Sequence, residues 1–144
     1  MEKPIDILLI EDNEADIRSV QEALKERKVF NKVHVARDGD EATLFLKREG
    51  QYSDVPRPGL ILLDLNLPRK NGMEVLKEIK EDQNLRRILV IVLTTSHAQE
   101  DVLKAYDLHV NCFISKPIDF NEFLRIVKQI EDFWLCIVQL PEKK

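Results

Sequence analysis

The sequence has few cysteines, no excess of positive charge and no long apolar run, and each absence narrows the class of protein. Its 144 residues include 2 cysteines, 22 Lys and Arg against 26 Asp and Glu, and a formal net charge of -4. Without a basic stripe we expect no nucleic-acid partner, because binding to a phosphate backbone depends on clustered cations. No run approaches the length of a membrane span and no signal peptide is visible, so we expect a cytoplasmic protein with no membrane partner. Cys112 and Cys136 lie in apolar segments without metal-binding spacing, which predicts reduced structural thiols.

Short apolar runs alternate with segments of helical period along the chain. The runs that we expect to be strands are 5–11, 33–37, 60–65, 89–95 and 111–115. Apolar residues spaced three and four positions apart predict a helix after each of them. A strand followed by a helix five times over predicts an α/β fold with a doubly wound, five-stranded parallel sheet and helices on both faces.

The predicted helices each have an apolar face. For the first four helices these faces are Ile17, Val20 and Leu24; Ala42, Phe45 and Leu46; Val75, Leu76 and Ile79; and Val102, Leu103 and Tyr106. The segment 49–59 contains two prolines and two glycines and is expected to be a loop without regular structure. Residues 1–144 are expected to form a single domain with a core over about 5–130, followed by the end of a long helix and a polar tail over 131–144.

Asp64 ends the most apolar of the predicted strands, and Pro68 prevents that strand from continuing. Glu11 and Asp12 end the first strand. In the flavodoxin-like strand order 2-1-3-4-5 the first and third strands are neighbours, so the three carboxylates converge at one edge of the sheet. Like charges so close together repel unless a cation lies among them, and all-oxygen ligands with room for water favour Mg²⁺. Capping of the first helix is the competing interpretation of Glu11 and Asp12, and the two roles are compatible.

The fourth and fifth predicted strands each add a group to the same edge. Thr94 supplies a hydroxyl that can donate to a phosphoryl oxygen, and Lys116 supplies the positive charge that a phosphate needs beside three acids. Pro117 restricts the backbone of the lysine. The sequence therefore predicts a site for a metal and a phosphoryl group.

This set of residues closely resembles the receiver domain of two-component response regulators. The resemblance rests on residues whose joint spacing is specific: Glu11-Asp12, Asp64 to Pro68 with Gly72, Thr94, Phe113, and Lys116-Pro117. It covers the chain from Ile5 to about Ile130. The loop over 49–59 and the Phe133-Trp134 pair are similar to stand-alone regulators that accompany bacterial phytochrome histidine kinases.

The resemblance implies a role for each of these residues. Asp64 would accept a phosphoryl group from a sensor histidine kinase, while Thr94 and Lys116 hold that group. Glu11, Asp12 and Asp64 would bind Mg²⁺ together with the main-chain carbonyl of Asn66. Thr94 and Phe113 would form the switch. Thr95 departs from the alanine, glycine or serine that is common beside the switch hydroxyl in receivers, and its bulk is expected to slow the attack of water on the acyl phosphate.

Two other functions stay open. A haloacid dehalogenase-like phosphatase also uses an aspartate at the end of a parallel strand, but it needs an acid two residues later, where this chain has Asn66. A degenerate receiver would act as an interaction module without phosphorylation, and the intact set of acids, hydroxyl and lysine speaks against it. In either receiver interpretation the chain is not a turnover enzyme.

The last predicted helix has more apolar surface than one sheet face can cover. Part of that surface could simply pack onto the same domain, but we expect it to form an interface, most simply a homodimer. The residues that we expect at this interface are Ile126, Ile130, Phe133, Trp134 and Ile137.

Overall fold

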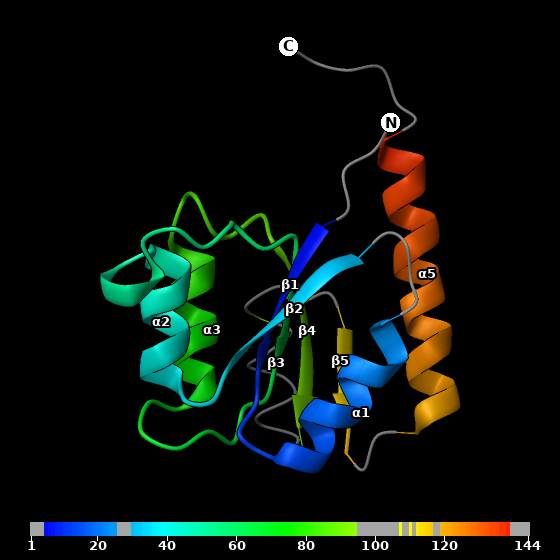
Figure 1. Ribbon diagram of the computed structural model, residues 1–144, viewed down its shortest axis with the longest axis horizontal. Coiled ribbons are helices and arrows are strands. Elements are labelled where there is room, and N and C mark those ends of the chain that lie inside the picture. Colours follow the sequence, from blue (N-terminus) through cyan, green and yellow to red (C-terminus); the bar gives the residue numbers. More distant parts are fainter. Residues whose placement is uncertain are drawn as a thin grey trace.

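A computed structural model describes residues 5–25, 30–94, 107, 110, 112–116 and 119–138. These residues form one parallel sheet with helices packed on both of its faces (Figure 1). Within the described ranges, no helix is both long enough and apolar enough to cross a membrane.

The sheet has five parallel strands in the order β2-β1-β3-β4-β5. The strands are β1 (Ile5–Ile10), β2 (Phe30–Ala36), β3 (Leu60–Leu63), β4 (Leu89–Thr94) and β5 (Cys112–Ser115). Ile10 pairs with Leu63, so the residues that follow β1 and β3 leave the sheet at the same level. The predicted fold class and strand order are confirmed.

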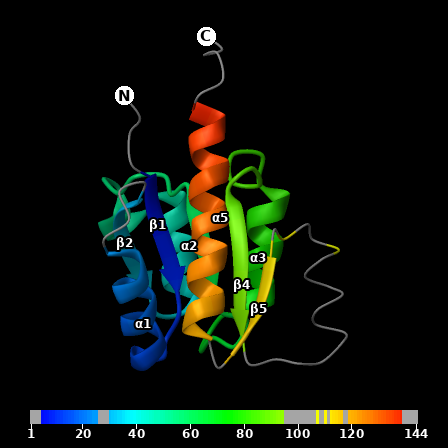
Figure 2. The same cartoon turned by 90° about the vertical axis from the view of Figure 1, so that its right-hand side faces the viewer.

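Among the residues that the structure describes, two helices lie on each face of the sheet. The described helices are α1 (Glu14–Leu24), α2 (Gly39–Lys47), α3 (Gly72–Glu81) and α5 (Phe120–Val138). Helices α2 and α3 cover one face and α1 and α5 cover the other, as the two perpendicular views show (Figures 1 and 2). The predicted helix between β4 and β5, with Val102, Leu103 and Tyr106, lies outside the described residues.

The core has two halves, one on each side of the sheet. Alternate residues of β1 face opposite sides: Leu8 and Ile10 pack with α2 and α3, whereas Ile7 and Leu9 pack with α1 and α5. The apolar faces predicted for the first three helices are all buried. Because both sides of the central strand β3 are covered, that strand is continuously apolar and buried.

Two segments differ most from the predictions. Strand β2 begins at Phe30, three residues before the predicted start, and it lies at the edge of the sheet. This edge strand has the polar residues Asn31 and Lys32 where a central strand would be apolar. The apolar run therefore begins later than the strand does, and the pattern does not indicate where β2 starts. The loop over 49–59 was expected to lack regular structure, but it contains a short 3₁₀ helix over Gly50–Tyr52. The ring of Tyr52 packs against Phe45 of α2, which stabilises this turn.

Helix α5 corrects one part of the predicted interface. Ile130 is buried in the core half beneath α1 and α5, so its side chain is not available to a partner. Ile126 is half-buried and packs against the same core half. The side chains of Phe133, Trp134 and Ile137 lie outside the described part of the structure, although the helix backbone there extends past the end of the sheet (Figure 2).

Candidate functional site

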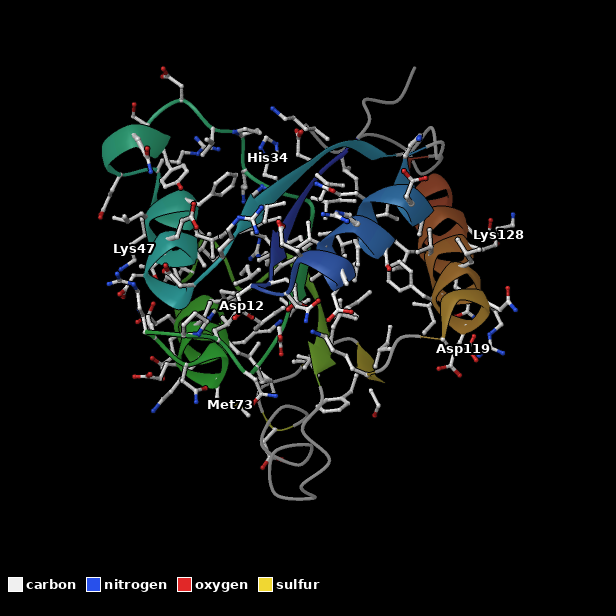
Figure 3. All side chains as sticks on the ribbon, turned by 60° about the horizontal axis from the view of Figure 1, so that its bottom comes forward. Asp12, His34, Lys47, Met73, Asp119 and Lys128 are labelled. Atoms are coloured by element: carbon white, nitrogen blue, oxygen red, sulfur yellow. The ribbon has the colours of Figure 1, made fainter. Side chains whose placement is uncertain are left out.

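Three carboxylates meet at the edge of the sheet where β1 and β3 end. Glu11, Asp12 and Asp64 each offer an oxygen, and these oxygens all lie within 4.8 Å of one another. Glu11 and Asp64 are buried, whereas Asp12 is exposed. Figure 3 looks onto this edge and labels Asp12 close to the beginning of α1. The structure thus brings together the three acids that the sequence predicted would converge.

The two buried carboxylates are fixed in the same way. Each follows its strand without a break, because the backbone N–H of Asp64 donates to the carbonyl of Ile10 at 3.0 Å, and that of Glu11 donates to Ala36 at 2.9 Å. One oxygen of each carboxylate then accepts a bond from the backbone N–H two residues later. These bonds are Asn13 N to Glu11 Oε2 at 3.1 Å and Asn66 N to Asp64 Oδ1 at 2.9 Å. The acids are therefore held in place by backbone groups before any ligand arrives.

Lys116 follows β5 and reaches the same acids from the end of that strand. Its Nζ lies 2.6 Å from Glu11 Oε1 and 3.1 Å from Asp64 Oδ2, and its side chain is buried. A buried ammonium is stable only beside compensating charge, and these two carboxylates provide it. The predicted convergence of the lysine with the acids is present in the structure.

The close contacts shift the pKa of both partners. Burial raises the pKa of Glu11 from 4.5 to about 7, against the lowering effect of the Lys116 hydrogen bond, and the charge of Asp64 raises it further. Burial alone would lower the pKa of Lys116, but its bonds to Asp16 and Glu11 and the charge of Asp64 raise it above its ordinary value. The lysine therefore stays charged beside the two buried carboxylates.

Asp16 belongs to the site although sequence reasoning missed it. Its Oδ2 lies 2.7 Å from Lys116 Nζ. Asp16 follows Asp12 by four residues and lies in the first turn of α1, after the N-cap Asn13, so the start of the helix brings its carboxylate to Lys116. This spacing is visible in the sequence, but it becomes informative only once the position of Lys116 is known.

The loop after Asp64 is held close to α3 by Gly72. A Cβ at Gly72 would lie 2.3 Å from the carbonyl oxygen of Asp64 and 2.5 Å from Leu65 Cα. The backbone N–H of Gly72 donates to the carbonyl of Leu65 at 3.1 Å. Only glycine allows this approach, which explains why Gly72 accompanies Asp64 in the sequence motif. Asn66, the remaining predicted metal ligand, is exposed at the start of this loop.

The predicted switch residues lie on neighbouring strands. Thr94 ends β4 and pairs with Ser115 of β5, so its backbone reaches the same edge, but its side chain lies outside the described part. Phe113 is half-buried and packs against the core half beneath α2 and α3. Thr95 and Pro117 also lie outside the described residues.

Comparison with known proteins agrees with this geometry. The family model for the response regulator receiver domain matches residues 7–128. Response regulator Rcp1 of Synechocystis sp. is 51% identical over 135 residues, which cover 94% of this chain and 92% of Rcp1.

Solved structures are similar over nearly the whole chain. The crystal structure of the phosphorylated cyanobacterial phytochrome response regulator RcpA has a TM-score of 0.83 and 51% identity, and the match covers 97% of this chain and 100% of RcpA. The Mn²⁺-bound form of Rcp1 has a TM-score of 0.82 and 50% identity, and the match covers 96% of this chain and 100% of that chain. With its sheet order, its carboxylates and its lysine in the arrangement described above, the chain belongs to the response regulator receiver domain family.

Proposed function

We propose that Asp64 accepts a phosphoryl group from a sensor histidine kinase in a reaction that depends on a divalent cation, and that the phosphorylated domain signals by contact with another protein. The observation that carries this proposal is the position of the Asp64 carboxylate. It lies within the 4.8 Å group of acids and 3.1 Å from the Lys116 ammonium, at the edge of the sheet. A carboxylate between a cation site and an ammonium is suited to attack phosphorus.

Apart from the cation and the phosphohistidine of the kinase, the transfer requires only groups that this chain supplies. A carboxylate oxygen of Asp64 forms a bond to phosphorus, the bond from phosphorus to the imidazole nitrogen of the kinase breaks, and its electron pair returns to the imidazole. Lys116 and Thr94 hold the oxygens of the phosphoryl group as it moves. The product is an acyl phosphate on Asp64, which water can hydrolyse.

The donor set fits Mg²⁺. Glu11, Asp12 and Asp64 provide only oxygen ligands, and we assign the carbonyl of Asn66 as the fourth protein ligand. When bound, the cation neutralises charge that develops on the phosphoryl oxygens. The Mn²⁺-bound form of Rcp1 supports a divalent cation in this family.

The relatives support a proposal about the partners. RcpA is described as a phytochrome response regulator, so we propose a phytochrome-type histidine kinase in the cytoplasm as the phosphodonor. We also propose that the end of α5 forms a homodimer through Phe133, Trp134 and Ile137, with Ile126 at its margin. The clustered apolar residues in that helix support an interface.

The two alternative functions have less support. This chain lacks the general acid that a haloacid dehalogenase-like phosphatase needs two residues after its aspartate, because position 66 is Asn. The backbone N–H of Asn66 donates to Asp64. A degenerate receiver would not need the network around Lys116.

Phospholabelling tests the proposal. Parent protein incubated with a phosphorylated histidine kinase and Mg²⁺ should become labelled, and Asp64→Asn, which keeps the shape but removes the nucleophile, should not. Chelation of Mg²⁺ should also abolish labelling. Asp54→Asn removes an exposed acid of the 49–59 loop and is the matched control, which should label like the parent. Equal labelling of Asp64→Asn and the parent would reject the proposal.

A further inference from the structure

Lys116 has an acidic contact that lies outside the group of metal-binding acids. Its Nζ is 2.7 Å from Asp16 Oδ2, in addition to 2.6 Å from Glu11 and 3.1 Å from Asp64. An ammonium has three N–H donors, so these three carboxylates can take all of them. The position of the ammonium therefore depends on its attraction to all three acids.

Asp16 differs from the other two acids in where it is anchored. Glu11 and Asp64 follow strands, whereas Asp16 lies in the first turn of α1, where its backbone N–H donates to the Asn13 side chain at 2.9 Å. Its side chain is 25% exposed, compared with 1% for Glu11. Asp16 thus approaches the ammonium from the helix side and from nearer the solvent.

A bound cation changes the attraction of these acids for the ammonium. Glu11 and Asp64 belong to the group of oxygens within 4.8 Å that would hold it, and Asp16 does not. Glu11 and Asp64 would share their charge with a bound divalent cation, and the cation would repel the ammonium beside them. Asp16 then remains as the one of these three acids that still offers Lys116 a full, unshared charge.

We propose that Asp16 is a positioning residue that keeps the Lys116 ammonium beside Asp64 once the divalent cation is bound, and thereby secures the contact between Lys116 and the transferred phosphoryl group. The contact between Lys116 and the phosphoryl group rests on the proposed function. The effect of Asp16 on the position of the ammonium does not. Asp16 acts through Lys116 and touches neither the cation nor the phosphorus.

The chain offers a well-matched set of variants. Asp16→Asn removes the charge and keeps the shape, and Asp16→Glu keeps the charge on a side chain one methylene longer. Glu14→Gln is the control, because Glu14 lies in the same first turn, is exposed, and pairs with Arg37 at 2.8 Å rather than with Lys116. It removes the same charge from the N-terminus of α1, so it reproduces any effect on the helix dipole.

The first experiment observes the ammonium itself by ¹⁵N NMR with saturating Mg²⁺. A held ammonium exchanges slowly with water and gives a Lys116 side-chain signal. We expect that signal in the parent, Glu14→Gln and Asp16→Glu, and its loss by exchange in Asp16→Asn. An undiminished signal in Mg²⁺-loaded Asp16→Asn would overturn the proposal, as would its absence from the Mg²⁺-loaded parent.

The second experiment measures labelling by a small acyl phosphate at saturating Mg²⁺. Asp16→Asn should lower the maximal rate of labelling about tenfold, which is the effect expected for the loss of a partly exposed, charge-assisted hydrogen bond. The donor concentration that gives half the maximal rate should stay unchanged. In a Lys116→Met background the same substitution should add nothing, and Asp16→Glu should restore part of the rate. Equal slowing in both backgrounds would show that Asp16 acts elsewhere. A parent that takes no label would contradict the proposed function, while the NMR result would still decide the role of Asp16.

Discussion

Glu11 is the most deeply buried acid of the site, and its environment makes the domain sensitive to pH. Burial, opposed by the Lys116 hydrogen bond and reinforced by the charge of Asp64, raises its pKa from 4.5 to about 7 in the metal-free protein. When folding raises the pKa of a group, the folded state holds its proton more tightly than the unfolded state does. The resulting stabilisation is fully present below the pKa of the unfolded state, and it is lost as the pH rises through the pKa of the folded state. The relevant window therefore lies between pH 4.5 and about 7.

We predict that the free energy of unfolding of the metal-free parent falls relative to that of Glu11→Gln as pH rises through this window. The amide of the variant cannot ionise, so it does not acquire a buried charge. Urea unfolding of both proteins in the presence of a chelator measures the difference. The affinity of the parent for Mg²⁺ should rise over the same window, because the cation requires the ionised acid. A parent that gains stability over Glu11→Gln with rising pH would contradict this assignment.

Gly72 is the residue at which the smallest chemical change should disturb the site. The added methyl of Gly72→Ala meets backbone atoms of Asp64 and Leu65, so either the loop or the start of α3 must move. We expect a loss of about 1–3 kcal/mol in unfolding free energy and weaker Mg²⁺ binding, measured by denaturation and calorimetry.

Gly50→Ala is the control for this substitution. Gly50 has a positive φ of 60° at the start of the 3₁₀ helix in the 49–59 loop, and a Cβ there would meet no atom within 4 Å. The substitution should cost about 1 kcal/mol through backbone strain alone and leave Mg²⁺ affinity unchanged. Unaltered Mg²⁺ affinity in Gly72→Ala would mean that this close approach does not position the acids.

The helices that bury a periodic apolar face could be predicted from the sequence. The start of the edge strand and the short 3₁₀ turn could not. The faces of α1, α2 and α3 follow from apolar spacing, because each of these helices packs one face on the sheet. The start of β2 and the 3₁₀ turn over Gly50–Tyr52 depend on an edge position and on the Phe45–Tyr52 ring contact, neither of which leaves a periodic signal. Ile130 was misassigned because helical spacing alone does not reveal how far around α5 the core extends.

Strands β4 and β5 are the elements through which phosphorylation should change the surface. Thr94→Ala should still accept label on Asp64, but it should lose the coupled shift of the Phe113 ring signals, because a ligand changes a conformation only through contacts that differ between two states. NMR of the phosphorylated proteins measures this shift. Ser115→Ala removes an exposed hydroxyl from the residue that pairs with Thr94 and should keep the shift. A full shift in Thr94→Ala would exclude Thr94 from the switch.

Over the whole molecule, the convergence of the site follows from topology. The order β2-β1-β3-β4-β5 brings the ends of β1 and β3 together, so residues far apart in the sequence, such as Glu11 and Asp64, could be assigned to one edge of the sheet from the sequence alone. Asp16 could not, since its role depends on where a lysine far along the chain places its ammonium.

The extension of α5 past the sheet leads to a prediction about assembly. Burial of one large apolar side chain contributes about 1.5–3 kcal/mol, so Phe133→Asp should weaken a homodimer by about tenfold or more. Sedimentation of the two proteins over a concentration series measures it. Gln129→Asp adds the same charge at an exposed position of the same helix and should leave the dimer intact. If the parent remains monomeric at every concentration, phosphorylated or not, the homodimer is rejected.

The most direct test of the account is to locate the phosphoryl group. After phosphorylation with Mg²⁺, borohydride reduces an acyl phosphate to an alcohol, and peptide mass spectrometry identifies the reduced residue. The account predicts reduction at Asp64 alone, and none when Mg²⁺ is chelated during phosphorylation. Reduction at Glu11, Asp12 or Asp16 with Asp64 unchanged would contradict it.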